Sequence, residues 1–248
     1  MGSEEPLDGG NGSGRVVRVG STVRKQWAAA TPSVTDYLDA LRRAGVDVPE
    51  TFGQDKHGRL VLEFIPGELA MHAAPLTPSD LARVGAMVRA IHDASETYRP
   101  PVDAVWDTAI PAPGGDLVCH NDLAPWNLIV GERWVFIDWD SSAPSTRLWD
   151  LAYAAQAFTL SDPNEHPHRS AANLVAFVDG YEADRGLRTL LPAMLEQRAA
   201  AMFQLLERSS HTGREPWASM FRTGHGDHWR AVKEYVGHHR ELWSAALR

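Results

Sequence analysis

The 248-residue sequence predicts an α+β protein of two lobes, the first an antiparallel sheet with one helix and the second mainly helical. Two observations predict this class. Runs rich in β-branched residues alternate with turn glycines before Pro66, and apolar residues at helical spacing follow it. We therefore expect a boundary near Pro66, with residues 1–66 as one lobe and residues 67–248 as the other.

The first lobe is predicted to hold two hairpins and a helix. Residues 15–19 and 21–25 flank Gly20 and predict a hairpin. Pro32 at a helix start, apolar spacing and a terminal Gly45 predict a helix over residues 31–45. Residues 53–65 predict a second hairpin, which turns at residues 56–58.

The second lobe is predicted to be mainly helical. Residues 78–94 keep apolar side chains at helical spacing. Further helices are expected around residues 150–159, 170–184, 189–208 and 228–246. Before them, the apolar runs 128–130 and 134–138 flank a turn with Gly131 and predict another hairpin.

Composition and charge narrow the classes of partner. The chain has 24 Lys/Arg against 32 Asp/Glu, a net charge of -8, and no basic run, which argues against nucleic acid or an anionic membrane as partner. Residues 71–165 hold 5 Lys/Arg and 13 Asp/Glu, an excess that suggests metal ligands or a cationic ligand, with a solvated acidic face as the alternative that each single carboxylate favours. The single cysteine and the lack of a signal or membrane segment predict a cytoplasmic protein with a small-molecule partner, neutral or cationic.

The segment from His120 to Asp138 carries the candidate chemistry. Asn127 enters the expected hairpin and Asp138 leaves it, so both should lie at its open end, where paired positions are roughly 5 Å apart. An amide oxygen and a carboxylate there suit a magnesium ion held against phosphates. Asp122 precedes Asn127 and is expected to orient and deprotonate an attacking hydroxyl, while His120 braces the loop.

Two further features suit phosphoryl transfer. The glycine-rich run that includes Gly10, Gly12 and Ser13 is expected to offer backbone amides to phosphates, although a flexible linker is the alternative. A cation on the following strand, Arg24 or Lys25, would neutralise phosphate charge. Neighbouring residues on a strand face opposite ways, so only one of them can point at a nucleotide, and we favour Lys25.

With these residues in place, the chain resembles the aminoglycoside phosphotransferase and choline kinase family, small-molecule kinases with the protein-kinase fold. The resemblance covers roughly residues 5–210. It depends on His120-x-Asp122 followed by Asn127, on Ile137-Asp138-Trp139-Asp140 and on Trp149-Asp150-Leu151-Ala152.

The resemblance implies a two-lobed protein-kinase-like fold that uses ATP and magnesium. By it, Asp122 is the catalytic base, Asn127 and Asp138 are magnesium ligands, and Asp150 is a structural acid of the larger lobe. It also implies that the backbone from Glu63 to Ile65 holds adenine.

Some positions depart from the family pattern. Asn121 stands where the family usually has Gly, a change that the backbone tolerates because Asn also adopts positive φ. The helical glutamate that partners the strand cation is not evident, and Asp36 is the nearest candidate. Asp140 is interpreted as a supporting residue, with metal ligand and loop cap as alternatives, and His92 as a packed structural histidine.

We expect an enzyme that transfers the γ-phosphoryl group of ATP to a hydroxyl of a small molecule. By the resemblance the leading acceptor is an aminoglycoside or related antibiotic, and the acidic middle segment agrees with a polycation. A kinase of a neutral sugar or nucleoside, a nucleotide-binding pseudokinase without turnover, and GTP as donor stay open as alternatives. The presence of Asp122, Asn127 and Asp138 argues against a pseudokinase, and the lack of Arg before Asp122 argues against a protein kinase.

Overall fold

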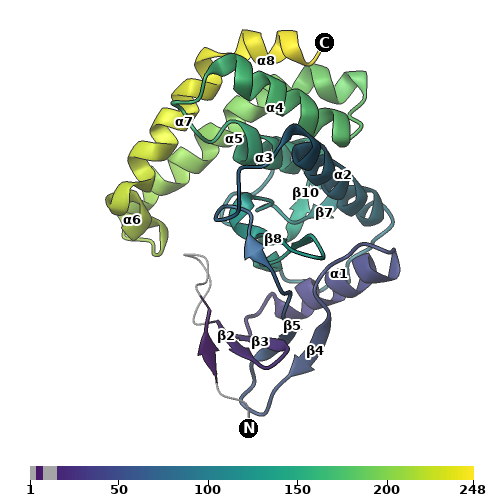
Figure 1. Ribbon diagram of the computed structural model, residues 1–248. Coiled ribbons are helices and arrows are strands. Elements are labelled where there is room, and N and C mark those ends of the chain that lie inside the picture. Colours follow the sequence, from purple (N-terminus) through teal and green to yellow (C-terminus); the bar gives the residue numbers. More distant parts are fainter. Residues whose placement is uncertain (1–3, 8–15) are drawn as a thin grey trace.

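The computed structural model describes residues 4–7 and 16–248 and confirms the α+β class. Figure 1 shows the strands that precede Pro66 and one helix at one end of the molecule, the later strands in the middle, and the long helices stacked at the other end. The loops that carry the candidate chemistry lie between these two ends.

The N-terminal part of the described chain forms a five-stranded antiparallel sheet in the order β1-β2-β3-β5-β4. Its strands are β1 (Glu5–Pro6), β2 (Val17–Val19), β3 (Thr22–Lys25), β4 (Thr51–Gln54) and β5 (Leu60–Glu63). Both expected hairpins are present, with positive φ at Gly20 and Gly58 in their turns. Lys25 is the last residue of β3, the central strand, and lies opposite Leu60.

Helix α1 (Thr31–Arg43) connects this sheet to the rest of the molecule. Its apolar face joins one core with the later helices. The fully buried Tyr37 donates a hydrogen bond to the Val118 carbonyl at 2.9 Å and shares another with Ser95 Oγ at 2.6 Å. The apolar core thus extends across the boundary expected near Pro66, and the division into residues 1–66 and 67–248 stays a prediction.

Two small sheets follow Pro66 and carry the loops of interest. One sheet has the order β6-β8-β9, and the other pairs β10 with β7. Their strands are β6 (Glu68–Leu69), β7 (Leu117–Cys119), β8 (Leu128–Val130), β9 (Val135–Phe136) and β10 (Ala143–Ser145). The β8–β9 pair is the hairpin expected from the sequence. Short 3₁₀ helices, η1 (Pro125–Asn127) and η2 (Trp139–Ser141), lie just before and after it.

Helices form most of the remaining chain. They are α2 (Pro78–Ser95), α3 (Arg147–Thr159), α4 (Pro167–Gly180), α5 (Arg185–Thr212), α6 (Trp217–Met220), α7 (Gly226–His238) and α8 (Arg240–Ala246). The expectation of one helix over residues 228–246 was wrong, because His239 has a φ of -99° and a ψ of 16° and separates α7 from α8. A kinked segment, η3 (Phe221–His225), joins α6 to α7, and Thr223 and Gly224 within it have non-helical backbone angles. Within the described residues, no helix is long and apolar enough to cross a membrane.

Helices α2 and α4 approach each other closely through two glycines. A Cβ atom on Gly85 would lie 2.1 Å from the carbonyl oxygen of Phe177, and one on Gly180 would lie 2.0 Å from the carbonyl oxygen of Ala82. Because neither glycine has a Cβ atom, the backbone of the other helix can pack directly against it. This contact fixes the position of α2, which contributes His92 to the centre of the molecule.

We predict that Gly85→Ala lowers the free energy of unfolding by about 2 kcal/mol, because overpacking outweighs the roughly 1 kcal/mol that alanine gains in a helix. Gly237→Ala in α7 is the matched control, since its new Cβ would meet only the Glu196 side chain, at 3.4 Å. That variant should be as stable as the wild type or more so. Chemical denaturation measures both, and unchanged stability of Gly85→Ala would contradict the packing described above.

Candidate active site

The loop after β7 carries the candidate base. Asn121 has a φ of 64°, a left-handed conformation that Asn adopts more readily than most residues, and its N–H donates to Asp150 Oδ1 at 2.8 Å. The buried His120 ring accepts the Asp122 N–H at Nδ1 (3.2 Å). In that tautomer its Nε2–H donates to the Ile137 carbonyl, at 3.1 Å. His120 thus bonds the loop of Asp122 on one side and the chain after β9 on the other.

The carboxylate of Asp122 is held by donors from two other segments. Asn127 Nδ2 donates to Asp122 Oδ2 at 2.8 Å and to the Asp122 carbonyl at 2.9 Å. The Tyr153 hydroxyl, from α3, donates to Asp122 Oδ1 at 2.9 Å. Burial raises the pKa of Asp122 above its usual value, while the neighbouring His120 and the two donors act in the opposite direction. A fixed, partly buried carboxylate of this kind suits a general base.

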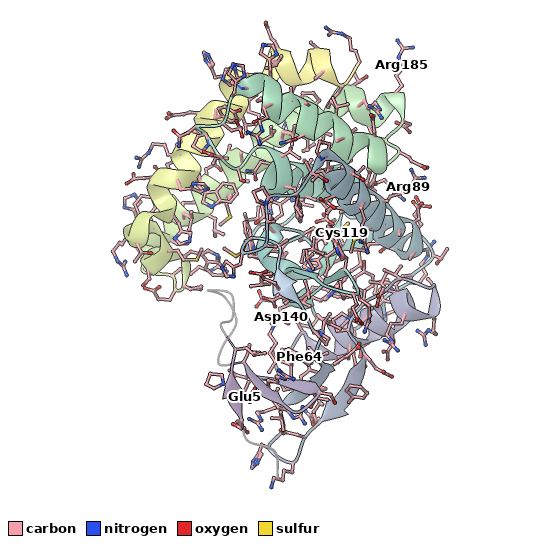
Figure 2. All side chains as sticks on the ribbon, viewed as in Figure 1. Glu5, Phe64, Arg89, Cys119, Asp140 and Arg185 are labelled. Atoms are coloured by element: carbon pink, nitrogen blue, oxygen red, sulfur yellow. The ribbon has the colours of Figure 1, made fainter. Side chains whose placement is uncertain are left out.

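A second cluster joins the sheet to the β8–β9 hairpin. Lys25 Nζ forms an ion pair with Asp138 and lies 2.7 Å from Asp140 Oδ2. Burial lowers the pKa of Lys25, but Asp138 and Asp140 more than offset that and hold its pKa above the usual value, so the ammonium stays charged. Asp140 lies between the strand end and the helical end of the molecule (Figure 2).

The strand decides between the two candidate cations. Arg24 lies 3.5 Å from Asp55 and donates to Thr22 Oγ1 at 2.6 Å, whereas Lys25 faces the carboxylates. The structure therefore brings Lys25, and not Arg24, to the site. Asp36 is also not the partner of this cation, because it accepts the Tyr98 hydroxyl at 2.8 Å.

The donor set at the hairpin fits a hard divalent cation. The Ile137 N–H donates to the Asn127 carbonyl at 2.8 Å, which places Asn127 beside the start of the Asp138 loop. Because the amide nitrogen of Asn127 is engaged by Asp122, its Oδ1 is the end left for a metal. With the carboxylates of Asp138 and Asp140, this makes an all-oxygen set of the kind that magnesium prefers.

The residues expected to hold a nucleotide are described only in part. At the predicted hinge, the N–H groups of Glu63 and Phe64 donate to the carbonyls of Glu50 and Ser21. The Ile65 N–H has no acceptor within the described residues, which suits a hinge donor to adenine. Gly10, Gly12 and Ser13 lie outside the described residues.

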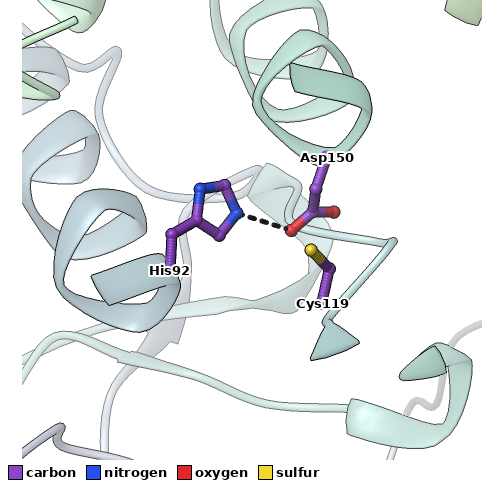
Figure 3. Close-up of side chains that lie close together, drawn as sticks. All are labelled: His92, Cys119 and Asp150. Atoms are coloured by element: carbon purple, nitrogen blue, oxygen red, sulfur yellow. Dashed lines mark hydrogen bonds and ion pairs between the residues drawn. The ribbon is translucent and has the colours of Figure 1, made fainter. Parts of the chain in front are cut away.

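Behind the loop, His92, Cys119 and Asp150 form a buried cluster (Figure 3). Their ligand atoms lie within 4.8 Å of one another. His92 Nε2 bonds Asp150 Oδ2 at 3.0 Å, and Asp150 Oδ1 accepts the Asn121 N–H. Cys119 Sγ–H donates instead to the Thr146 carbonyl, at 3.9 Å. Since each of the three side chains has a protein partner, the cluster supports the loop structurally, and the packed position of His92 agrees with the sequence prediction.

Sequence reasoning did not identify Tyr153 and Arg198, which lie next to Asp122 and Asn121. Tyr153 follows Asp150 by three residues, so helical spacing could have placed it on the same side of α3. Arg198 lies on α5, far along the sequence, and donates to the Asn121 carbonyl at 3.3 Å. No local pattern marks it.

The segment that carries this site matches a known protein family. Residues 102–190, which include Asp122, Asn127, Asp138 and Asp150, match the model of the phosphotransferase enzyme family. The trifolitoxin immunity protein of Rhizobium leguminosarum bv. trifolii is 27% identical over 269 aligned positions, which cover 100% of both chains.

Solved structures of small-molecule kinases share the fold at low sequence identity. A microcompartment-associated aminopropanol kinase superposes with a TM-score of 0.69 at 15% identity, over 100% of this chain and 95% of that one. An amicoumacin kinase, solved with AMP-PNP, Ca²⁺ and Ami, has a TM-score of 0.70 at 14% identity, over 95% of this chain and 88% of that one. These comparisons confirm the resemblance seen in the sequence, because residues 102–190 match the phosphotransferase family model and the chain shares the fold of these solved structures.

Proposed function

We propose that the chain is a kinase that transfers the γ-phosphoryl group of ATP, with magnesium, to a hydroxyl of a small molecule. The observation that carries the proposal is the arrangement at the β8–β9 hairpin. Asp122, held by Asn127, lies beside a cluster in which Lys25 meets Asp138 and Asp140. Both the family match and the fold support an enzyme that phosphorylates hydroxyl groups.

Each residue of the cluster has a role in phosphoryl transfer, which depends on positioning and charge neutralisation more than on covalent chemistry. Asp122 accepts the proton of the acceptor hydroxyl as that oxygen attacks the γ-phosphorus and the bond to the β-phosphate oxygen breaks. The Lys25 ammonium is placed to neutralise phosphate charge. Asn127 and Asp138 would hold magnesium, which would supply further positive charge against the phosphates.

The acceptor that we propose is an antibiotic or toxin of low molecular weight. The relative matched along its whole length is named for immunity to trifolitoxin, and a structural neighbour is an amicoumacin kinase. Within the acidic middle segment, Asp93 and Glu96 pair with Arg147, and Asp80 caps α2. These three carboxylates already have partners within the protein, so they do not support a cationic acceptor. Support for such an acceptor comes from the carboxylates of the candidate active site.

A screen of ADP release tests the function and narrows the acceptor. ATP or GTP with magnesium is offered with aminoglycosides and other hydroxylated antibiotics, small amino alcohols, neutral sugars and nucleosides. We expect acceptor-dependent ADP release with ATP and a member of the antibiotic group. If no acceptor raises ADP release above the rate without acceptor, the proposal is wrong, and preference for an amino alcohol or a neutral sugar would reassign the acceptor.

We predict that Asp122→Asn lowers kcat by about 100-fold or more, since a positioned general base contributes ~10²- to 10⁴-fold. The amide keeps the shape of the side chain, so nucleotide affinity should stay near that of the wild type. Steady-state kinetics and calorimetric titration with ADP and magnesium measure the two effects. Asp103→Asn, on an exposed loop, is the control. Turnover at the original rate would show that Asp122 is not the base.

The neighbours Lys25 and Arg24 offer a matched pair. Lys25→Met should weaken nucleotide binding by about 10- to 100-fold, because a charge-assisted hydrogen bond contributes ~1.5–3 kcal/mol. Arg24→Met removes a cation one residue away whose side chain faces Asp55 instead, and its nucleotide affinity should change little. Fluorescence titration with a nucleotide analogue compares them. Equal losses in both variants would contradict the assignment of Lys25.

A further inference from the structure

The hydroxyl of Tyr153, on helix α3, is directed toward the carboxylate of Asp122, the candidate base. Tyr153 is 3% exposed, and its hydroxyl donates to Asp122 Oδ1 at 2.9 Å. Burial raises the pKa of Tyr153 well above its usual value, and the charge of Asp122 adds to this, so the phenol keeps its proton and stays a donor. With Asn127 on Oδ2, both carboxylate oxygens of Asp122 have a fixed donor.

A buried cation lies against the ring of Tyr153. The guanidinium of Arg198 is 4.1 Å from the Tyr153 ring centre and 5.3 Å from that of Trp149, and the residue is 3% exposed. Its Nη2 donates to the Asn121 carbonyl at 3.3 Å. Arg198 thus contacts both the ring that holds Asp122 and the peptide that precedes Asp122.

The pairing of Arg198 is incomplete. Its Nε and Nη1 are buried and find no hydrogen-bond acceptor within the described residues, and its Nη2 bonds a backbone carbonyl rather than a carboxylate. A buried cation without an ion pair lowers the stability of the fold, because burial removes its hydration and no opposite charge compensates for it. A costly group in contact with the loop of the candidate base indicates a role other than stability.

We propose that Tyr153, backed by Arg198, is a positioning residue that fixes the carboxylate of Asp122 toward the acceptor hydroxyl. The proposal rests on the kinase function proposed above. Two donors on different oxygens, from α3 and from η1, define the plane of the carboxylate. The Arg198 cation over the ring keeps the phenol in place and favours its donor role. Loss of the phenol would remove the donor on Oδ1, so that only the Asn127 bond on Oδ2 would oppose rotation of the carboxylate about its last torsion.

A simpler interpretation is that Tyr153 only fills space, since its ring stacks on Trp229 with centroids 6.5 Å apart. Tyr153→Phe distinguishes the positioning role from a packing role, because it keeps the ring and removes only the hydroxyl. We expect kcat to fall about 10-fold, as it does when a hydrogen-bonded residue that orients a metal ligand is lost, with KM for ATP and the melting temperature almost unchanged. Tyr235→Phe is the matched control, because it removes a buried hydroxyl bonded to Ser170 Oγ, and should leave kcat unchanged.

A double-mutant cycle shows whether Tyr153 acts through Asp122. In the Asp122→Asn background, Tyr153→Phe should cause no further loss of kcat. Independent, multiplicative losses would overturn the proposal, as would wild-type kcat in Tyr153→Phe when Asp122→Asn is impaired. Full activity of Asp122→Asn, or no ADP release by the wild type, would instead refute the proposed function itself, and the positioning role with it.

The contribution of Arg198 has its own variants. Arg198→Met should lower kcat about as much as Tyr153→Phe does, without changing KM for ATP. Arg198→Lys keeps the positive charge and should retain a higher kcat than Arg198→Met. The melting temperature of both Arg198 variants is measured by thermal denaturation. A loss of kcat without a loss of stability indicates a positioning role rather than a role in folding. Wild-type kcat in a folded Arg198→Met variant would overturn the role given to Arg198.

Discussion

The buried carboxylate of Asp150 is the anchor on which the rest of the site depends. It is fully buried, accepts the Asn121 N–H on one oxygen and bonds His92 on the other. Loops seldom hold a positive φ at a non-glycine residue without such support. Because Asp150 fixes the peptide of Asn121, the backbone direction at the next residue, Asp122, is fixed as well. The carboxylate of Asp122 therefore lies within hydrogen-bond distance of its donors Tyr153 on α3 and Asn127 on η1.

The anchor is itself part of a network that spans several elements. His92 Nδ1 bonds the Tyr181 hydroxyl at 2.8 Å, and Arg147 donates to that same hydroxyl at 2.9 Å. Helices α2 and α3 and the C-cap of α4 therefore share the polar contacts that hold the loop of the candidate base. The glycine contact between α2 and α4 belongs to the same system, since it fixes the helix from which His92 projects.

Charge pairing joins the five-stranded sheet to the segment after β9. Lys25 comes from the central strand β3, and its partners Asp138 and Asp140 come from the loop after β9. Asp138, like Asn121, has a positive φ, at 59°. Both left-handed positions are held by Asn or Asp, whose short polar side chains tolerate this conformation.

The sequence by itself determined the fold class, the hairpins, most helices and the order of the polar motifs, because periodicity and turn residues are local signals. It placed Asn127 and Asp138 together through a hairpin, which is also a local element. Tertiary structure alone decided that Lys25 rather than Arg24 faces the carboxylates, that Asp36 bonds Tyr98, and that Tyr153 and Arg198 stand behind Asp122. Those contacts join segments far apart in the chain, and the packing of whole helices sets them, which no short pattern encodes.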